Sequence, residues 1–238
     1  MYNRIVLNLL VDETHVYLSR RFKKQKFCKL AETIDFLEIN EMCAYCDEIS
    51  IIYVGDGNLE NMEKIMDKAG LNSLFVPMAI GGGIKSKEDA KKALELGCDK
   101  ITISTSLYNK PEIIKDISKY CGRQSITLPI QITHDGKENK IKRWQNKGSN
   151  FVEEVMIEQI TSNLNQLDIG ELILIDIEGE ESSVLNNEVL SELKNSYLII
   201  ENHDFLMKGS KKEQYDEFVK NLNNNFTVEI IHNSYRAV

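Results

Sequence analysis

The chain has 238 residues, 42% of them hydrophobic, so it is long enough to form one large barrel or two small domains. Its formal net charge of −8 argues against a general nucleic-acid binder. No run approaches the roughly 18 apolar residues of a membrane span, and no basic region with an apolar run opens the chain, so we expect no membrane segment and no signal peptide.

Apolar runs and helical patterns alternate along the chain. Near-continuous apolar runs are typical of parallel strands that are covered on both faces. They predict strands at Arg4–Val11, Glu48–Val54, Leu74–Ile80, Lys100–Ser104, Ser125–Ile132, Glu171–Ile177, Tyr197–Ile200 and Thr227–Ile231. Helical patterns lie between them at Ala31–Ala44, Leu59–Ala69, Lys87–Leu96, Pro111–Tyr120, Val152–Leu164, Asn187–Lys194 and Lys211–Leu222.

Eight strands joined by right-handed crossovers predict an α/β fold, a (β/α)8 TIM barrel. No shift in composition divides the chain, so we expect residues 1–238 to form a single domain. The polar segment His134–Lys147 predicts a hairpin insertion after the fifth strand. Because the chain runs only seven residues past Ile231, we expect a degenerate C-terminal quarter without a regular eighth helix.

Two segments predict a phosphate site at the carboxyl ends of neighbouring strands. Ala79–Ile84 contains three successive glycines, and Ile101–Ser106 ends in hydroxyl residues. Glycines have no Cβ, so an anion can approach the main-chain N–H groups directly. The candidate phosphate-binding residues are Gly82, Gly83, Ser104 and Thr105. The alternative is an ordinary tight turn between strand and helix.

Several segments follow in an order and spacing that resemble HisF, the cyclase subunit of imidazole glycerol phosphate synthase. They are Arg4–Val6, Gly81–Ile84, Gly97–Ile101, Asn109–Pro111 and Gly170–Leu174. The resemblance implies a half-barrel duplication with a phosphate site in each half. It also implies a HisH-like glutaminase docked under the barrel, which supplies ammonia. The first loop, Phe22–Phe27, resembles a side branch that accompanies amidation of surface sugars, which implies a sugar amidation synthetase as a further partner.

The chain departs from the family at its acid–base positions. The resemblance places two aspartates near the ends of the first and fifth strands, where this chain has Leu10 and Gln131. Neither side chain can transfer a proton, so we assign no catalytic residue. Nearby carboxylates could replace the aspartates only if the geometry shifted: Asp12, Glu13, Asp176 and Glu180.

The second phosphate site is also altered. An acidic cluster stands where the resemblance places this site: Asp176, Glu178, Glu180 and Glu181. These carboxylates would repel a phosphate. They form either a site for a metal or cationic group, or a solvated acidic loop.

Four charged residues stand just before apolar strand runs: Arg4, Glu48, Lys100 and Glu171. They match the ring that closes the barrel floor in the HisF family and gates the ammonia route. Two cations and two anions can satisfy one another in a narrow, partly dry ring. The alternative is that they face solvent at the strand starts. Asp99 matches a position at the family's glutaminase interface.

Metal and cofactor patterns are weak. The four histidines show no ligand spacing, and the Cys43–Cys46 pair lacks a second ligand pair, so we expect neither a metal nor a cofactor. Five irregularly spaced cysteines suit reduced thiols, which favours a cytoplasmic protein. Three functions remain: a HisF-like ammonia-accepting barrel for surface-sugar amidation, an active cyclase (lyase) of histidine biosynthesis, or a non-catalytic phosphate-binding scaffold.

Overall fold

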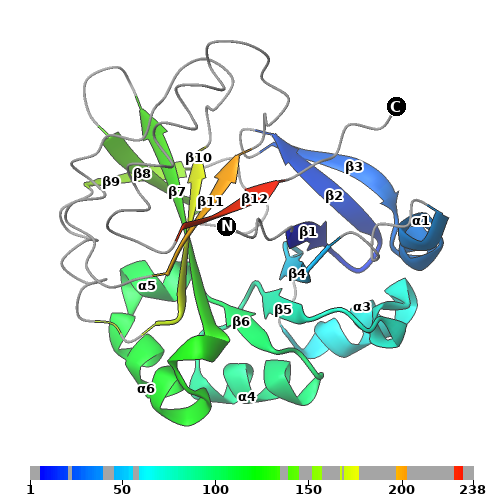
Figure 1. Ribbon diagram of the computed structural model, residues 1–238, viewed down its shortest axis with the longest axis horizontal. Helices are drawn as coiled ribbons and strands as arrows, with labels where there is room; N and C mark the ends of the chain where they lie inside the picture. The colour runs from blue at the N-terminus through cyan, green and yellow to red at the C-terminus, as the bar shows by residue number, and fades with distance from the viewer. Residues whose placement is uncertain are drawn as a thin grey trace.

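The computed structural model describes residues 6–20, 23–39, 46–55, 59–134, 139–144, 152–156, 167, 169–176, 197–202 and 228–232. Within these residues the strands form one curled sheet (Figure 1). Its parallel strands follow one another in chain order: β1 (Val6–Val11), β4 (Glu48–Tyr53), β5 (Met78–Gly81), β6 (Lys100–Thr102), β7 (Ile126–His134), β10 (Glu171–Asp176), β11 (Tyr197–Asn202) and β12 (Val228–His232).

The first and last parallel strands approach each other. Residues of β12 come within 8 Å of residues of β1, measured between Cα atoms. Together with the parallel order, this curvature confirms the predicted α/β class and (β/α)8 TIM barrel. Each predicted strand run overlaps one parallel strand of the wall, although the run at Leu74–Ile80 becomes a strand only from Met78.

Helices cover the outer face of this wall (Figure 1). They are α1 (Thr33–Ile39), α3 (Met62–Ala69), α4 (Lys87–Glu95), α5 (Thr105–Asn109) and α6 (Pro111–Cys121), with short 3₁₀ turns η1 (Leu30–Glu32), η2 (Leu59–Asn61), η3 (Leu71–Ser73) and η4 (Arg123–Ser125). The Ser86 side chain caps α4 by accepting a hydrogen bond from the Asp89 N–H. Pro111 opens α6, where its missing N–H costs no hydrogen bond. Among the described residues, no helix is long and apolar enough to cross a membrane.

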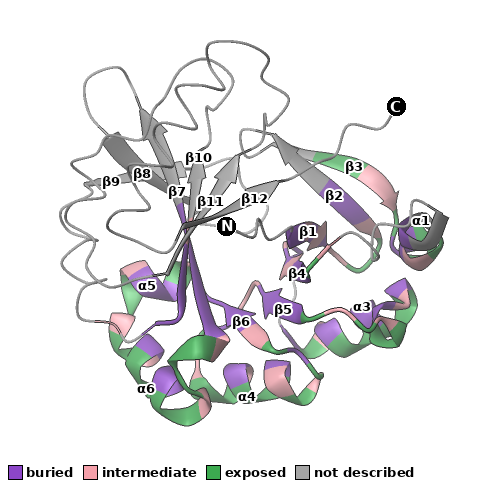
Figure 2. Ribbon diagram, viewed as in Figure 1, coloured by how far each residue is buried: buried purple, intermediate pink, exposed green. Residues whose placement is uncertain are grey.

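The hydrophobic core lies between the strands and these helices (Figure 2). On β4, Ile49 and Ile51 are fully buried, and they belong to the same cluster as Met66 of α3 and Ala90 of α4. The residues that alternate with them, Glu48 and Ser50, are polar. Since successive strand residues point to opposite faces, the outer face is apolar and the inner face carries polar groups.

The structure corrects two sequence expectations. The basic first loop contains an antiparallel hairpin, β2 (His15–Arg20) with β3 (Lys23–Lys29). The expected helix at Val152–Leu164 begins instead as a strand, β9 (Val152–Met156), which pairs with β8 (Asn139–Trp144). The predicted hairpin insertion is confirmed, because β8 pairs antiparallel with the end of β7. The helices expected at Asn187–Lys194 and Lys211–Leu222, and the end of the chain past β12, lie outside the described residues.

Candidate functional site

Three charged side chains meet on the inner face at the amino ends of the strands. The Lys100 Nζ lies 2.8 Å from Glu48 Oε2 and 2.6 Å from Glu171 Oε1. These residues open β6, β4 and β10, none of which is a neighbour of another in the sheet. Their side chains therefore reach one another across the inside of the barrel. Arg4, the fourth predicted member, lies outside the described residues.

This charged cluster is shielded from solvent. Its side chains are 17% (Lys100), 7% (Glu48) and 10% (Glu171) exposed. The Thr127 hydroxyl of β7 also donates a hydrogen bond to Glu171, at 3.2 Å. The two Lys100 contacts, at 2.8 and 2.6 Å, have the short length of strong charge-assisted hydrogen bonds. Removing one partner would leave the remaining charges buried without a counter-charge. The arrangement fits a closed floor; its role as an ammonia gate stays a prediction.

Polar side chains continue along the inner face above the charged cluster. Ser50 and Thr102 stand two residues after Glu48 and Lys100, and Asn8 pairs with Ser50 across β1 and β4. Within the described part of the chain, Asn8 Oδ1 and Thr102 Oγ1 are buried and have no hydrogen-bond partner. Buried polar atoms without protein partners suit a small polar molecule. A polar residue two positions after Glu48 and after Lys100 is a signal in the sequence that could have identified Ser50 and Thr102.

The carboxyl rim brings the two predicted phosphate-binding segments together. Gly82 and Gly83 both have positive φ, 88° and 94°. A Cβ on Gly82 would lie 2.1 Å from the Tyr53 carbonyl oxygen, so the turn requires glycine there. The Ser106 hydroxyl of α5 donates a hydrogen bond to the Ile84 carbonyl, at 3.1 Å, which ties the glycine loop to the start of α5.

Ser104 and Thr105 lie at that same helix start, after β6. Ser104 is the N-cap residue of α5 and Thr105 is its first residue. The four candidate residues therefore share one edge of the sheet. Phosphate binding there stays a prediction.

The positions that the resemblance pairs with catalytic aspartates lie on the barrel wall. Leu10 is half-buried on β1, and it pairs in register with Ile52 of β4. Gln131 belongs to β7, where its backbone pairs with Ile175 of β10. Asp176 ends β10. The side chains of Gln131 and Asp176, together with all of Glu178, Glu180 and Glu181, fall outside what the structure describes.

Asp12 is held in the turn between β1 and β2. Its Oδ1 accepts hydrogen bonds from the Thr14 and His15 N–H groups, and its Oδ2 accepts one from the Tyr17 hydroxyl. Burial raises the pKa of Asp12, but these hydrogen bonds outweigh that effect and lower the pKa to about 2. A carboxylate that is so weakly basic and already hydrogen-bonded is a poor substitute for a catalytic aspartate.

Glu13 is similarly engaged. Its carboxylate accepts hydrogen bonds from the Tyr53 hydroxyl and the Asn61 amide, and the Tyr53 contact lowers the pKa of Glu13. The Lys68 ammonium donates to the Glu13 carbonyl, at 3.0 Å. Together these contacts fasten the turn after β1 to β4 and α3.

Asp99 lies on the floor side and is exposed. Its Oδ2 accepts a hydrogen bond from the Met78 N–H, at 2.9 Å, which fixes the start of β5 beside β6. Contact with a partner stays a prediction.

Among the described residues, no group of three His, Cys, Asp or Glu side chains could hold a metal ion.

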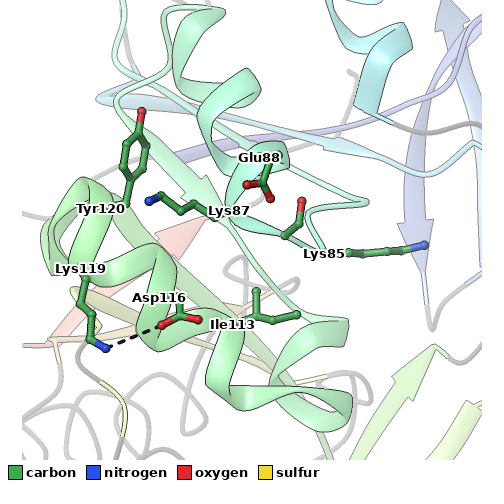
Figure 3. A pocket seen from close by; sticks show the side chains of 8 residues that line it. Lys85, Lys87, Glu88, Ile113, Asp116, Lys119 and Tyr120 are labelled. Carbon is green, nitrogen blue, oxygen red and sulfur yellow. Dashed lines mark ion pairs between the residues drawn. The ribbon is translucent and has the colours of Figure 1, made fainter.

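A separate groove of about 650 Å³ lies on the outer surface between the start of α4 and α6 (Figure 3). Its lysines do not converge on a common point: Lys87 lies over the Tyr120 ring, 4.9 Å from the centroid, while Lys119 pairs with Asp116 at 3.7 Å and Lys85 points away (Figure 3). The groove is therefore lined by charges that do not form one binding point.

Comparison with known proteins places these features in a family. Residues 50–199 match the family described as "Histidine biosynthesis protein". The chain is 28% identical over 183 residues to a Parasynechococcus marenigrum protein provisionally named imidazole glycerol phosphate synthase subunit hisF2, covering 74% of this chain and 64% of that one.

Two further relatives are named imidazole glycerol phosphate synthase subunit HisF. The Legionella pneumophila protein is 30% identical over 138 residues, covering 57% of this chain and 61% of its own length. The Dictyoglomus turgidum protein is 29% identical over 139 residues, covering 56% of this chain and 53% of its own. The chain thus spans between 53% and 64% of the length of these three relatives.

Proposed function

The chain belongs to the histidine biosynthesis protein family, and from that premise we propose that it is a HisF-like barrel that accepts ammonia from a HisH-like glutaminase partner. Ammonia would enter at the amino ends of the strands and travel along the inner face toward the opposite rim. The product would be an amidated surface sugar, made with a sugar amidation synthetase, in place of an imidazole ring.

The observation that carries this proposal is the shielded cluster of Lys100, Glu48 and Glu171 at the floor. A cluster of paired charges excludes bulk water, yet it can open by the movement of one side chain. Above it, the Asn8 and Thr102 oxygens, which have no partner among the described residues, offer hydrogen bonds to a molecule as small as ammonia. The charged cluster at the floor and the polar side chains above it together suit a channel for ammonia.

We expect no cyclase chemistry because of the side chains at Leu10 and Gln131, the two positions that the resemblance pairs with catalytic aspartates. Positioned proton transfer typically contributes about 10²- to 10⁴-fold to a rate, and neither leucine nor glutamine can supply it. Asp12, which the structure places in a hydrogen-bonded turn, does not compensate. At the rim, Gly82, Gly83, Ser104 and Thr105 would hold one phosphate group of the acceptor.

The competing function is an active cyclase, because the relatives named HisF are subunits of imidazole glycerol phosphate synthase. A histidine auxotroph that lacks its cyclase subunit separates the two. We expect the chain to give no growth without histidine, whereas the Legionella pneumophila relative, as the positive control, restores it. Growth supported by this chain would establish cyclase activity and overturn the proposed loss.

The ammonia route is tested with the glutaminase encoded in the same genome. The two full chains are expected to form a complex by size-exclusion chromatography with light scattering. In that complex, Lys100→Ala should increase the ammonia that escapes per glutamine hydrolysed, because the floor is opened. Lys92→Ala is the matched control, since the exposed Lys92 pairs with Glu60 on the outer surface. Equal escape in both variants would contradict the gate.

A further inference from the structure

A series of hydrogen bonds links a histidine ring to a carboxylate in the turn between β1 and β2. The His15 Nδ1 lies 2.9 Å from the Thr14 Oγ1, and the Thr14 hydroxyl donates a hydrogen bond to Asp12 Oδ1, at 2.8 Å. The same Asp12 oxygen accepts hydrogen bonds from the backbone N–H groups of Thr14 and His15. Three neighbouring side chains therefore form one relay, from imidazole through hydroxyl to carboxylate.

The direction of these hydrogen bonds fixes the tautomer of His15. Burial raises the pKa of Asp12, but its hydrogen bonds lower the pKa to about 2, so its carboxylate is ionised at neutral pH and only accepts hydrogen bonds. The single proton of the Thr14 hydroxyl is used toward Asp12, so the Thr14 oxygen must accept from the ring. In neutral His15 the proton is therefore on Nδ1, and Nε2 keeps a lone pair that can accept a proton.

Strand register places His15 on the same face of the wall as Leu10. Leu10 of β1 pairs in register with Tyr17 of β2, so these two side chains share a face. His15 stands two residues before Tyr17 on the same strand, and the centroids of the two rings lie 6.1 Å apart. Val16, between them, belongs to the apolar core on the outer face. His15 therefore extends the inner face beyond Leu10, at the carboxyl end of β1.

The turn that carries His15 is joined to the glycine loop through Tyr53. The Tyr53 hydroxyl donates a hydrogen bond to Glu13 in the turn, and the Tyr53 backbone lies directly against Gly82. Val11, the last residue of β1, pairs in register with Tyr53, the last residue of β4. The histidine and the candidate phosphate-binding loop are therefore fixed on neighbouring strand ends of one rim.

We propose that His15 is a catalytic base at this rim, with Nε2 as the proton acceptor, and that Thr14 and Asp12 are positioning residues for its ring. This inference rests on the proposed function, because the proton comes from the ammonia that attacks the acceptor. The ammonia nitrogen forms a bond to an electrophilic carbon of the acceptor, and the π electrons of that carbon move to its heteroatom. The nitrogen is then cationic and passes one proton to Nε2, which leaves a neutral amine and an imidazolium; the imidazolium returns the proton to the heteroatom. The relay to Asp12 stabilises the imidazolium, because its Nδ1–H already donates toward a carboxylate-bound hydroxyl.

NMR of the histidine ring nitrogens in the full-length chain tests the relay without any acceptor. We expect neutral His15 to carry its proton on Nδ1 in the wild type and in Thr14→Ser, which keeps the hydroxyl. Thr14→Val has nearly the same shape but no hydroxyl, so the preference for Nδ1–H should be lost. A wild-type ring with its proton on Nε2, or a tautomer that Thr14→Val leaves unchanged, would overturn the inference.

The chemical role is tested in the source organism by mass spectrometry of its surface sugars, after the gene for this chain has been deleted. The reintroduced wild type should restore the amidated sugar. His15→Asn keeps a hydrogen-bond donor near the Nδ1 position but has no basic nitrogen, so the rate of amidation should fall about 10²- to 10⁴-fold. Lys92→Ala, on the outer surface, is the control and should match the wild type. The Tm of His15→Asn, measured on the purified chain, should also match the wild type.

The outcomes separate the two proposals. If the wild-type chain does not restore the amidated sugar, the proposed function fails, and the role of His15 in it fails as well. If the wild type restores it and His15→Asn does so at the same rate, only the catalytic base is refuted. If His15→Asn is inactive but Thr14→Val is as active as Thr14→Ser, the positioning role of the hydroxyl is refuted.

Discussion

Replacement of Lys100 by methionine should destabilise the protein strongly at neutral pH. Coulomb's law, with an effective dielectric constant of about 20, gives about 6 kcal/mol of attraction for each pair at the observed 2.8 and 2.6 Å, before desolvation is subtracted. Removing one member of a buried ion pair has a net cost of about 3–5 kcal/mol, because the remaining charge stays buried. We expect Lys100→Met to lose that much in the free energy of unfolding, measured by urea denaturation.

The deficit should depend on pH and on the other two charges. Without the cation, one of the two glutamates in the folded variant would hold a proton more tightly than in the unfolded chain. A group whose pKa is raised by folding contributes stability that is present at low pH and is lost as pH rises, so the deficit should shrink between pH 7 and pH 5. The triple variant Glu48→Gln, Lys100→Met, Glu171→Gln should recover most of the stability at pH 7. A loss below about 1 kcal/mol in the single variant, the range of an exposed pair, would refute this reasoning.

Three further predictions concern residues outside the charged cluster. Gly82→Ala should lower the free energy of unfolding by about 1–3 kcal/mol through backbone strain, and further through the clash with the Tyr53 carbonyl. Gly97→Ala is the control, because Gly97 has a similar φ of 88° but a Cβ there would meet nothing within 4 Å, so only the strain should be lost. Equal losses in the two variants, measured by thermal denaturation, would be inconsistent with the clash. Asp12, whose pKa is lowered to about 2, stabilises the fold above about pH 4 and loses that contribution as pH falls toward 2, so acid titration of Asp12→Asn should show a flatter decline than wild type. Burial raises the pKa of Cys98 to about 12, so iodoacetamide at pH 8 should label it only after unfolding, and rapid labelling of the native protein would disprove its protection.

The barrel wall was predictable because its strands are buried on the outer face. Runs such as Glu48–Tyr53 and Glu171–Asp176 contain consecutive apolar residues that no surface helix would carry. The hairpin β2–β3 was missed because Lys23–Lys26 has no apolar residue to reveal a strand. β2 pairs with β3 and, at its start, with the end of β1, a tertiary effect that a local pattern does not contain.

The error at Val152–Met156 has a different cause. Val152, Val155 and Met156 recur at positions i, i+3 and i+4, which is the spacing of a helix face. The structure shows a strand instead, since β8 offers a partner for five consecutive residues. Pairing with a neighbouring strand therefore outweighed local periodicity.

The floor of the site could be predicted in part. A charged residue directly before an apolar run marked Glu48, Lys100 and Glu171, and the structure brings all three together. Sequence reasoning missed Asn8 and Thr102, because single polar residues inside apolar runs were treated as ordinary strand positions. Which face they occupy depends on strand register, and only the folded sheet reveals it.

The placement of the core has a consequence for how such a protein can evolve. Packing between wall and helices supplies the apolar core of the described residues, and Leu10, near the carboxyl end of β1, is not part of that core. A lineage could therefore exchange a reactive carboxylate for a residue such as Leu10 and still inherit an intact scaffold. Reactive side chains lie on the inner face of the strands and packing side chains on the outer face, so a residue of the first kind can change without disturbing the second.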